Sequence, residues 1–146
     1  MRGWEYYSAA FAIIKDEQWK ILFQKRANTG FRDGFYQLPS GHLEWEESMI
    51  ACIIREVKEE INLDVAEKDC RVVHMSHSVN PWERTYFNIY IEISTYSWEL
   101  KNMETNKCSE LRFIDRDEIR TSELCAYDNY ILEKIEAWEP FSDRIL

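Results

Sequence analysis

One segment, residues 41–63, constrains this chain more than any other, because it places acidic side chains at fixed spacings in a loop and a helix. It reads GHLEWEESMIACIIREVKEEINL. At 100° per residue its isoleucines and valine collect on one side, which predicts a helix from about Ser48 to Ile61 with that side against a core. Within five residues of this helix lie three carboxylates: Glu56, Glu59 and Glu60.

This acidic cluster predicts a site for a divalent metal ion. Like charges at i,i+4 cost a helix roughly 0.2–0.5 kcal/mol. Glu56 and Glu60 have no basic residue three or four positions away to offset this cost, whereas Glu59 has Arg55 four positions earlier. Hard cations such as Mg²⁺ take oxygen ligands, so a metal ion is a natural partner for these carboxylates. The alternative is an acidic helix face that is simply solvated.

The spacing of the whole segment resembles the Nudix box, G-x5-E-x7-R-E-U-x-E-E-x-G-U, in which U is an aliphatic residue. Eight of its nine positions match. The exception is Asn62, which stands where the pattern has glycine. We expect that position to end the helix with a positive φ, a conformation that asparagine tolerates best after glycine. The matching residues are Gly41, Glu47, Arg55, Glu56, Val57, Glu59, Glu60 and Leu63.

The resemblance implies which atoms bind the metal, expected to be Mg²⁺ or Mn²⁺. Glu56, Glu59 and Glu60 would be ligands, joined by a backbone carbonyl at Gly41 or Ser40. These glutamates would also be catalytic, because one carboxylate must deprotonate the attacking water. Family members differ in which glutamate does so, and the sequence leaves this open.

The resemblance also implies residues that support the metal ligands. Arg55 would hold the carboxylates in register through bidentate hydrogen bonds, and Glu47 would pair with Arg55 and fix the loop against the helix. A further ligand often enters this family's site from a loop near the last strand. Glu110 is the candidate here, and an ordinary acid on an edge strand is an equally good interpretation of it.

The composition describes one globular domain, residues 1–146. Hydrophobic residues make up 45% of the chain and charged residues 31%, which is typical of a folded domain. A net charge of −9 argues against a nucleic acid polymer as partner, because no basic stripe would neutralise its phosphates. No apolar run is long enough for a membrane helix or a signal peptide. Four well-separated cysteines predict reduced thiols and a cytoplasmic protein.

Apolar periodicity predicts a mixed arrangement of strands and helices without regular β-α alternation. This favours an α/β fold in which helices flank a mixed sheet, and the resemblance implies the same fold, an α/β/α sandwich. We predict strands at residues 7–15, 20–26, 70–78, 85–95 and 110–114, and a final helix at 122–138.

Arginines and aromatic residues outside the box are candidates for substrate binding. Arg26 ends a predicted strand, and Arg32 and Arg84 lie in predicted loops, where a guanidinium can hold a phosphate. Phe35 and Trp82 are candidates for stacking on a base. For each of them a surface or packing role is the alternative.

These patterns together predict an enzyme. The expected reaction is metal-dependent hydrolysis of a nucleoside diphosphate linked to another group, X. The substrate would be a small molecule: a nucleoside triphosphate (oxidised forms included), a nucleotide sugar or a dinucleotide. The alternative is a catalytically inert Nudix-fold module that binds a nucleotide, but such modules usually lose box carboxylates, and this chain keeps them. The sequence leaves the oligomeric state open, a homodimer included.

Overall fold

The computed structural model describes residues 5–81, 84–97 and 99–146. Within these residues no helix has the length and apolar character needed to cross a membrane. The elements, in chain order, are β1 (Tyr6–Ile14), β2 (Ile21–Arg26), β3 (Tyr36–Gln37), β4 (Ser40–His42), α1 (Met49–Ile61), the short 3₁₀ helix η1 (Glu67–Asp69), β5 (Cys70–Val79), β6 (Thr85–Ile93), β7 (Cys108–Ile114), α2 (Arg116–Thr121), the short 3₁₀ helix η2 (Glu123–Cys125), α3 (Ala126–Glu136) and β8 (Phe141–Ile145).

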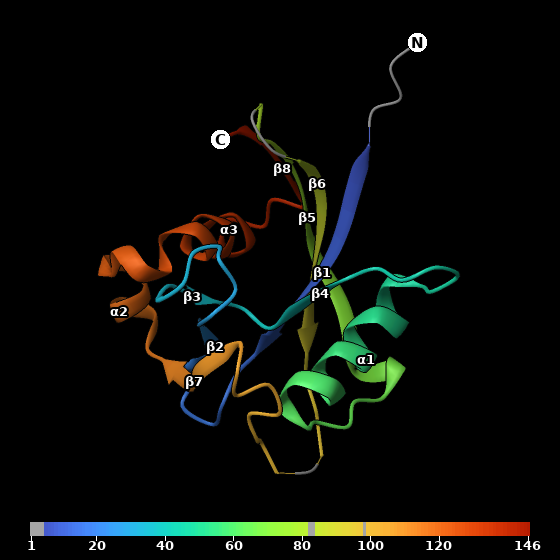
Figure 1. Cartoon of the computed structure of the whole chain (residues 1–146), viewed down its shortest axis with the longest axis vertical. Helices are drawn as coiled ribbons and strands as arrows, with labels where there is room; N and C mark the ends of the chain where they lie inside the picture. The colour runs from blue at the N-terminus through green and yellow to red at the C-terminus, as the bar shows by residue number, and fades with distance from the viewer. Residues whose placement is uncertain (1–4, 82–83, 98) are drawn as a thin grey trace.

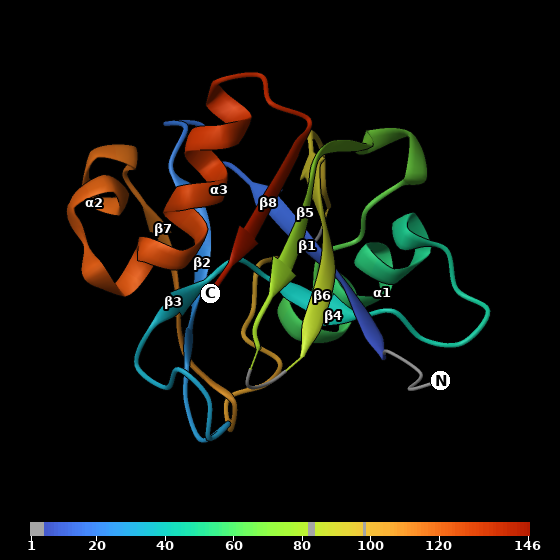
Figure 2. The same ribbon diagram turned by 90° about the horizontal axis from the view of Figure 1, so that it is seen from above.

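A mixed five-stranded sheet with the order β4-β1-β6-β5-β8 lies between the helices, which confirms the predicted fold class. In it β1 runs parallel to β6 and β5 runs parallel to β8, while the other pairs are antiparallel. Helix α1 covers one face and α3 the other (Figures 1 and 2). A second, antiparallel sheet with the order β3-β2-β7 lies beside the first.

Strand β1 has a hydrophobic core on each of its two faces. Ala9, Phe11 and Ile13 pack on the side of α3, whereas the side chains between them, such as Ala10 and Ala12, pack on the side of α1. Successive side chains of a strand point to opposite faces. A strand that is covered on both faces therefore appears in the sequence as an unbroken apolar run, as β1 does.

The elements that the sequence did not predict are short or polar. Strands β3 and β4 are only two and three residues long, too short to show an alternating pattern. Strand β8 contains Asp143 and Arg144, and it adds to the edge of the sheet beside β5. The final helix was predicted to begin at Ser122, but its first turn is η2 and regular α-helix begins at Ala126.

Residues of the box cap both ends of α1, Ser48 through its side chain and Asn62 through its backbone. The Ser48 hydroxyl accepts a hydrogen bond from the Ala51 amide. Asn62 ends the helix with φ 66° and ψ 19°, which is the expected left-handed conformation. Its side-chain amide also donates to the Glu99 carbonyl at 3.0 Å. The box helix therefore stops at a fixed point beside the loop that follows β6.

Substitutions at Asn62 should separate its backbone conformation from its side-chain contact. We expect Asn62→Val to lower the free energy of unfolding by about 1–2 kcal/mol, because a β-branched side chain is strained at positive φ. Asn62→Gly should be nearly neutral, since glycine accepts this φ but loses the bond to Glu99. Urea unfolding of both variants measures the difference, and equal stabilities would show that φ does not matter at this position.

Candidate active site

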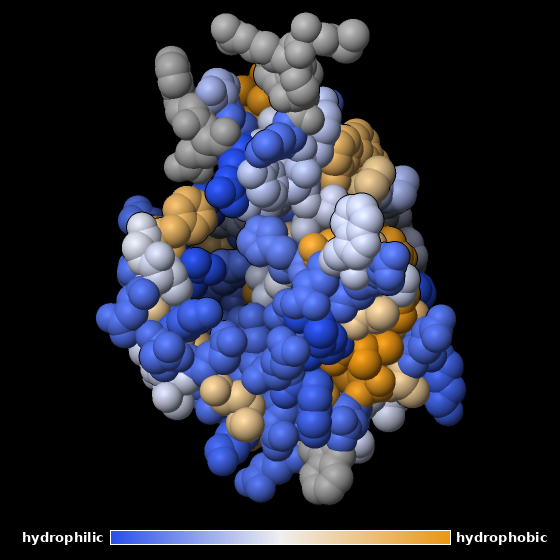
Figure 3. Space-filling model, turned by 45° about the vertical axis from the view of Figure 1, so that its right-hand side comes forward, coloured by the Kyte–Doolittle hydropathy of each residue, from blue (hydrophilic) through white to orange (hydrophobic). Residues whose placement is uncertain are grey.

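A cleft of about 960 Å³ brings the box residues together with segments that are distant in the sequence. The hollow left of centre in Figure 3 has a mostly hydrophilic rim. Strand β4 and the loop after it form one wall, and the second half of α1 presents its carboxylates there. The box residues that line the cleft are Gly41, Arg55, Glu56, Glu59 and Glu60.

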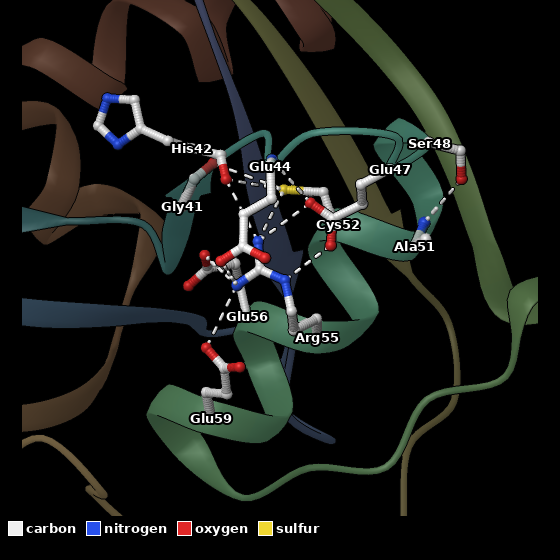
Figure 4. Close-up of polar contacts among 10 residues, drawn as sticks. All are labelled: Gly41, His42, Glu44, Glu47, Ser48, Ala51, Cys52, Arg55, Glu56 and Glu59. Atoms are coloured by element: carbon white, nitrogen blue, oxygen red, sulfur yellow. Dashed lines mark hydrogen bonds and ion pairs between the residues drawn. The ribbon is translucent and has the colours of Figure 1, made fainter.

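Arg55 is the centre of the acidic cluster (Figure 4). Its Nε and Nη2 donate to the two carboxylate oxygens of Glu47 at 2.6 and 3.1 Å, the expected bidentate pairing. Its Nη1 donates to Glu56 at 2.7 Å and to Glu59 at 3.2 Å. Its Nη2 also donates to the His42 carbonyl at 3.2 Å. Glu56 therefore has a basic partner after all, because the long Arg55 side chain reaches its own chain neighbour.

Glu47 fixes the loop before α1 and is not among the residues that line the cleft. One of its oxygens also accepts from the Glu44 amide at 3.0 Å. The hydrogen bonds that Arg55 donates lower the pKa of Glu47 to about 2, and the same bonds, accepted by Glu47, raise the pKa of Arg55. Both groups are thus charged at neutral pH, and Glu47 acts on the site through Arg55.

Glu60 carries the strongest sign of a missing partner. Its Oε2 is buried, and within the described part of the chain it has no hydrogen-bond partner. Burial, together with the negative charges of Glu56 and Glu104, raises the pKa of Glu60 to about 8. An unpartnered buried oxygen beside two more carboxylates is costly without a cation. This donor set fits a hard divalent metal.

As the side chains stand, no three acidic, histidine or cysteine groups of the described residues surround one point closely enough to hold a metal ion. Arg55 explains this at two positions, because it binds an oxygen of Glu56 and an oxygen of Glu59. The groups that could hold the metal are the carboxylates of Glu56, Glu60 and Glu104, and the Gly41 carbonyl.

Gly41 is required by a close approach and not by its backbone dihedrals. A Cβ at this position would overlap the side chain of Glu56. The backbone at Gly41 and His42 also contacts α1, since the buried Cys52 thiol lies 3.7 Å from the Gly41 carbonyl oxygen and 3.5 Å from the His42 carbonyl oxygen. The glycine thus lets the Glu56 carboxylate lie directly against the loop backbone.

Gly41→Ala should therefore displace the Glu56 carboxylate. We expect kcat to fall about tenfold, because a misplacement near 1 Å in a catalytic group can cost up to 10²-fold. The free energy of unfolding should change by less than about 1 kcal/mol, since the flexible Glu56 side chain can move into the cleft. Steady-state kinetics measures the fall in kcat, and urea unfolding of the same preparation measures the change in the free energy of unfolding. Unchanged kcat would show that the position of Glu56 is not critical.

The structure does not bring Glu110 to the acidic cluster. Glu110 pairs in register with Lys25 on β2 and accepts from the Tyr36 hydroxyl at 2.9 Å. Gln24 and Arg26, which flank Lys25 on β2, line the cleft. Because neighbouring residues of a strand alternate between faces, Glu110 lies on the other face of that sheet. Beside Glu60, a carboxylate from outside the box is instead supplied by Glu104, which lines the cleft and which sequence reasoning missed.

Four of the five residues proposed for substrate binding line the cleft: Arg26, Arg32, Phe35 and Arg84. The fifth, Trp82, lies outside the described residues. Arg26 has little freedom, because its guanidinium donates to three groups of the neighbouring loop and strand at 2.7–3.1 Å: the Phe31 carbonyl, the Gln37 side chain and the Thr29 hydroxyl. Arg26 thus holds the loop at residues 28–35 in place.

Sequence reasoning also missed a polar floor on the α3 side of the sheet. Ser78, Asn88 and Asp128 are buried and line the cleft, and each has a side-chain oxygen without a hydrogen-bond partner in the described residues. Burial raises the pKa of Asp128 to about 6, while its other oxygen accepts from the Leu38 amide at 2.8 Å. One sequence signal could have indicated Asp128. It falls on the same helical face as the apolar Leu124 and Ile131, where an acidic side chain is unusual because that face is expected to be buried.

An aromatic wall faces this floor. Arg32 stacks on the rings of Phe31 and Tyr127, with its guanidinium carbon 5.1 and 4.1 Å from the two ring centroids. Phe35 also lines this end of the cleft, and it stays 43% exposed. A flat ligand could thus be held between rings and polar atoms.

Comparison with known proteins places this geometry in a family. The family model for the NUDIX domain matches residues 5–138. The fold is similar to that of a MutT protein from Methanosarcina mazei Go1, at 19% identity and a TM-score of 0.78, covering 94% of this chain and 97% of that one. It is also similar to a MutT protein from Bacillus halodurans (15%, TM-score 0.75, 95% and 89%).

A NUDIX hydrolase from Nitrosomonas europaea shares the fold as well, at 20% identity and a TM-score of 0.73, covering 94% of this chain and 93% of that one. At these identities the solved structures establish the fold, and the match of the family model over most of the chain establishes membership. The chain belongs to the Nudix family and is a pyrophosphohydrolase that acts on nucleoside diphosphate derivatives.

Proposed function

We propose that residues 1–146 act as one Nudix domain that uses Mg²⁺ or Mn²⁺ to hydrolyse the diphosphate bond of a nucleoside diphosphate linked to a group X. The observation that carries this proposal is the unpartnered buried oxygen of Glu60, which lies beside Glu56 in a cleft large enough for a nucleotide.

Each acidic residue has a distinct task in this proposal. Glu56, Glu60 and Glu104 supply the oxygen ligands, with Glu59 at the exposed rim, and one of these carboxylates takes the proton of the attacking water. Arg55 holds Glu56 and Glu59 in place and does not contact substrate. The bound metal, when present, stabilises negative charge on the phosphate oxygens and lowers the pKa of water.

The other end of the cleft suits the nucleoside. The free oxygens of Asp128 and Asn88 are acceptors, so they would pair with N–H groups on the edge of a base. Phe31, Phe35 and Tyr127 offer rings beside them. This division of the cleft favours substrates with one base and a diphosphate, such as nucleoside triphosphates or nucleotide sugars.

A screen for release of a nucleoside monophosphate, run with and without metal, tests the proposal. Nucleoside triphosphates, oxidised triphosphates, nucleotide sugars and dinucleotides would be incubated with Mg²⁺, with Mn²⁺ and with EDTA. We expect metal-dependent release of a nucleoside monophosphate from at least one class. Binding of nucleotides by calorimetry without turnover of any of them would instead favour the inert binding module, and turnover in EDTA would contradict the metal.

A further inference from the structure

The loop that carries Glu104 also brings a lysine to the cleft. The Asn102 side chain closes this loop, because its amide donates to the Cys108 carbonyl at 2.7 Å and its oxygen accepts from the Glu104 amide at 3.1 Å. The amide of Lys107 in turn donates to the Glu104 carbonyl at 2.9 Å. Glu104 and Lys107 are thus held in one tight turn, and both line the cleft.

The same loop is fastened to the body of the protein on two sides. The Met103 amide donates to the Glu60 carbonyl at 2.9 Å, at the end of α1. On the other side, the Ala27 amide donates to the Lys107 carbonyl at 2.8 Å, and the Asn28 side chain donates to the Asn106 carbonyl at 3.0 Å. Hydrogen bonds on both sides therefore hold the backbone around Lys107 in place.

The ammonium group of Lys107 differs from the other cations of the cleft in having no partner among the described residues. Arg55 is bound by carboxylates, and Arg26 by the loop that it supports. Arg32 and Arg84 stack on rings, the latter 4.3 Å from the centroid of Tyr7. Within the described residues Lys107 forms hydrogen bonds only through its backbone, one of them to Glu104 in the same turn.

We propose that Lys107 is a substrate-binding residue whose ammonium group contacts a phosphate oxygen of the substrate's diphosphate. A lysine is a compact charge with three donors on a flexible stem, so it can reach an oxygen that a metal held by Glu60 and Glu104 leaves exposed. This inference rests on the proposed function and deepens it, because it adds a cation of the protein's own to the phosphate end of the cleft.

Three variants test this contact: Lys107→Ala, Lys107→Arg and the matched control Lys101→Ala. Lys101 is exposed at the start of the same loop and is not among the residues that line the cleft. We expect Lys107→Ala to raise KM for the best substrate, and Kd for inorganic pyrophosphate with Mg²⁺, about tenfold. Lys107→Arg should recover most of this loss, and Lys101→Ala should match the unsubstituted protein.

Mn²⁺ binding without substrate separates a direct contact from an effect on the metal ligands. Unchanged Mn²⁺ affinity in Lys107→Ala supports the proposal, whereas a tenfold loss would overturn it, because the lysine would then act through Glu104. Kinetics and pyrophosphate binding equal to those of Lys101→Ala would also overturn it. If the protein hydrolyses no nucleotide, the proposed function fails, but a tenfold effect on pyrophosphate binding would still establish the contact.

Discussion

Glu60→Gln is expected to lower kcat by at least about 10²-fold, the loss typical when a key electrostatic group of an active site is removed. Glutamine keeps the shape of the side chain but removes the charge that a divalent cation requires. The fold should survive, and Mn²⁺ affinity should fall together with kcat. The matched control is Glu17→Gln, which makes the same change at an exposed turn away from the cleft.

The same variant should change how stability depends on pH in metal-free protein. The pKa of Glu60 is raised to about 8 in the folded state from an ordinary value of 4.5. Between these values the folded protein binds more protons than the unfolded chain, so stability falls as pH rises through this window. Glu60→Gln should flatten that slope and make the protein more stable at pH 8, by on the order of 1 kcal/mol.

Urea unfolding in EDTA from pH 4.5 to 8.5 measures this slope. Near-normal turnover of Glu60→Gln at saturating Mg²⁺ would remove Glu60 from the metal ligands. An unchanged pH slope would show instead that its carboxylate is better solvated than its burial indicates.

Arg55→Ala should damage both activity and stability. It leaves the largely buried Glu47, whose side chain is 12% exposed, without its bidentate partner. It also releases Glu56 and Glu59 to repel each other. We expect the free energy of unfolding to fall by about 2 kcal/mol, below the 3–5 kcal/mol of a fully buried pair because Arg55 itself is 22% exposed. We expect kcat to fall about 10²-fold, since the ligands lose their positions.

The pH dependence of this loss has a definite sign. The pKa of Glu47 is lowered to about 2 from 4.5, so its contribution is present above pH 4.5 and is lost as pH falls towards 2. The stability of Arg55→Ala should therefore lack the part that is lost at acidic pH. The control is Arg71→Ala, which breaks an ion pair with Glu92 through an arginine side chain that is 68% exposed and should cost less than about 1 kcal/mol. Equal losses in the two variants would contradict a central role for Arg55.

The sequence predicted the geometry of the box because that geometry is local. Arg55, Glu56 and Glu59 share one helix, Glu47 lies in the loop that enters it, and Gly41 lies in β4 directly before that loop. All five are therefore close together along the chain. The positive φ at Asn62 follows in the same way from its place after the last helical residue.

Residues from outside the box depend on tertiary pairing, which spacing does not encode. Glu104 and Glu110 are six positions apart in the sequence. The register between β2 and β7 turns Glu110 away from the cleft, whereas hydrogen bonds of the loop at residues 102–108 hold Glu104. Asp128 reaches the cleft from α3, whereas the other two residues of the polar floor, Ser78 and Asn88, come from β5 and β6. These three residues come together only when the five-stranded sheet has formed, so no local sequence pattern predicts that they share a site.

Side chains of β1 point alternately to its two faces, so substitutions on one face can affect substrate binding while substitutions on the other affect the box helix. The odd-numbered residues Ala9 and Phe11 of β1 line the cleft at the end proposed for the nucleoside, whereas Ala10 and Ala12 pack on the side of the box helix. A change on the first face alters what the cleft accepts, and a change on the second alters how firmly the carboxylates are held. A lineage can therefore acquire new substrates through one face of a single strand while its hydrolytic machinery stays intact on the other.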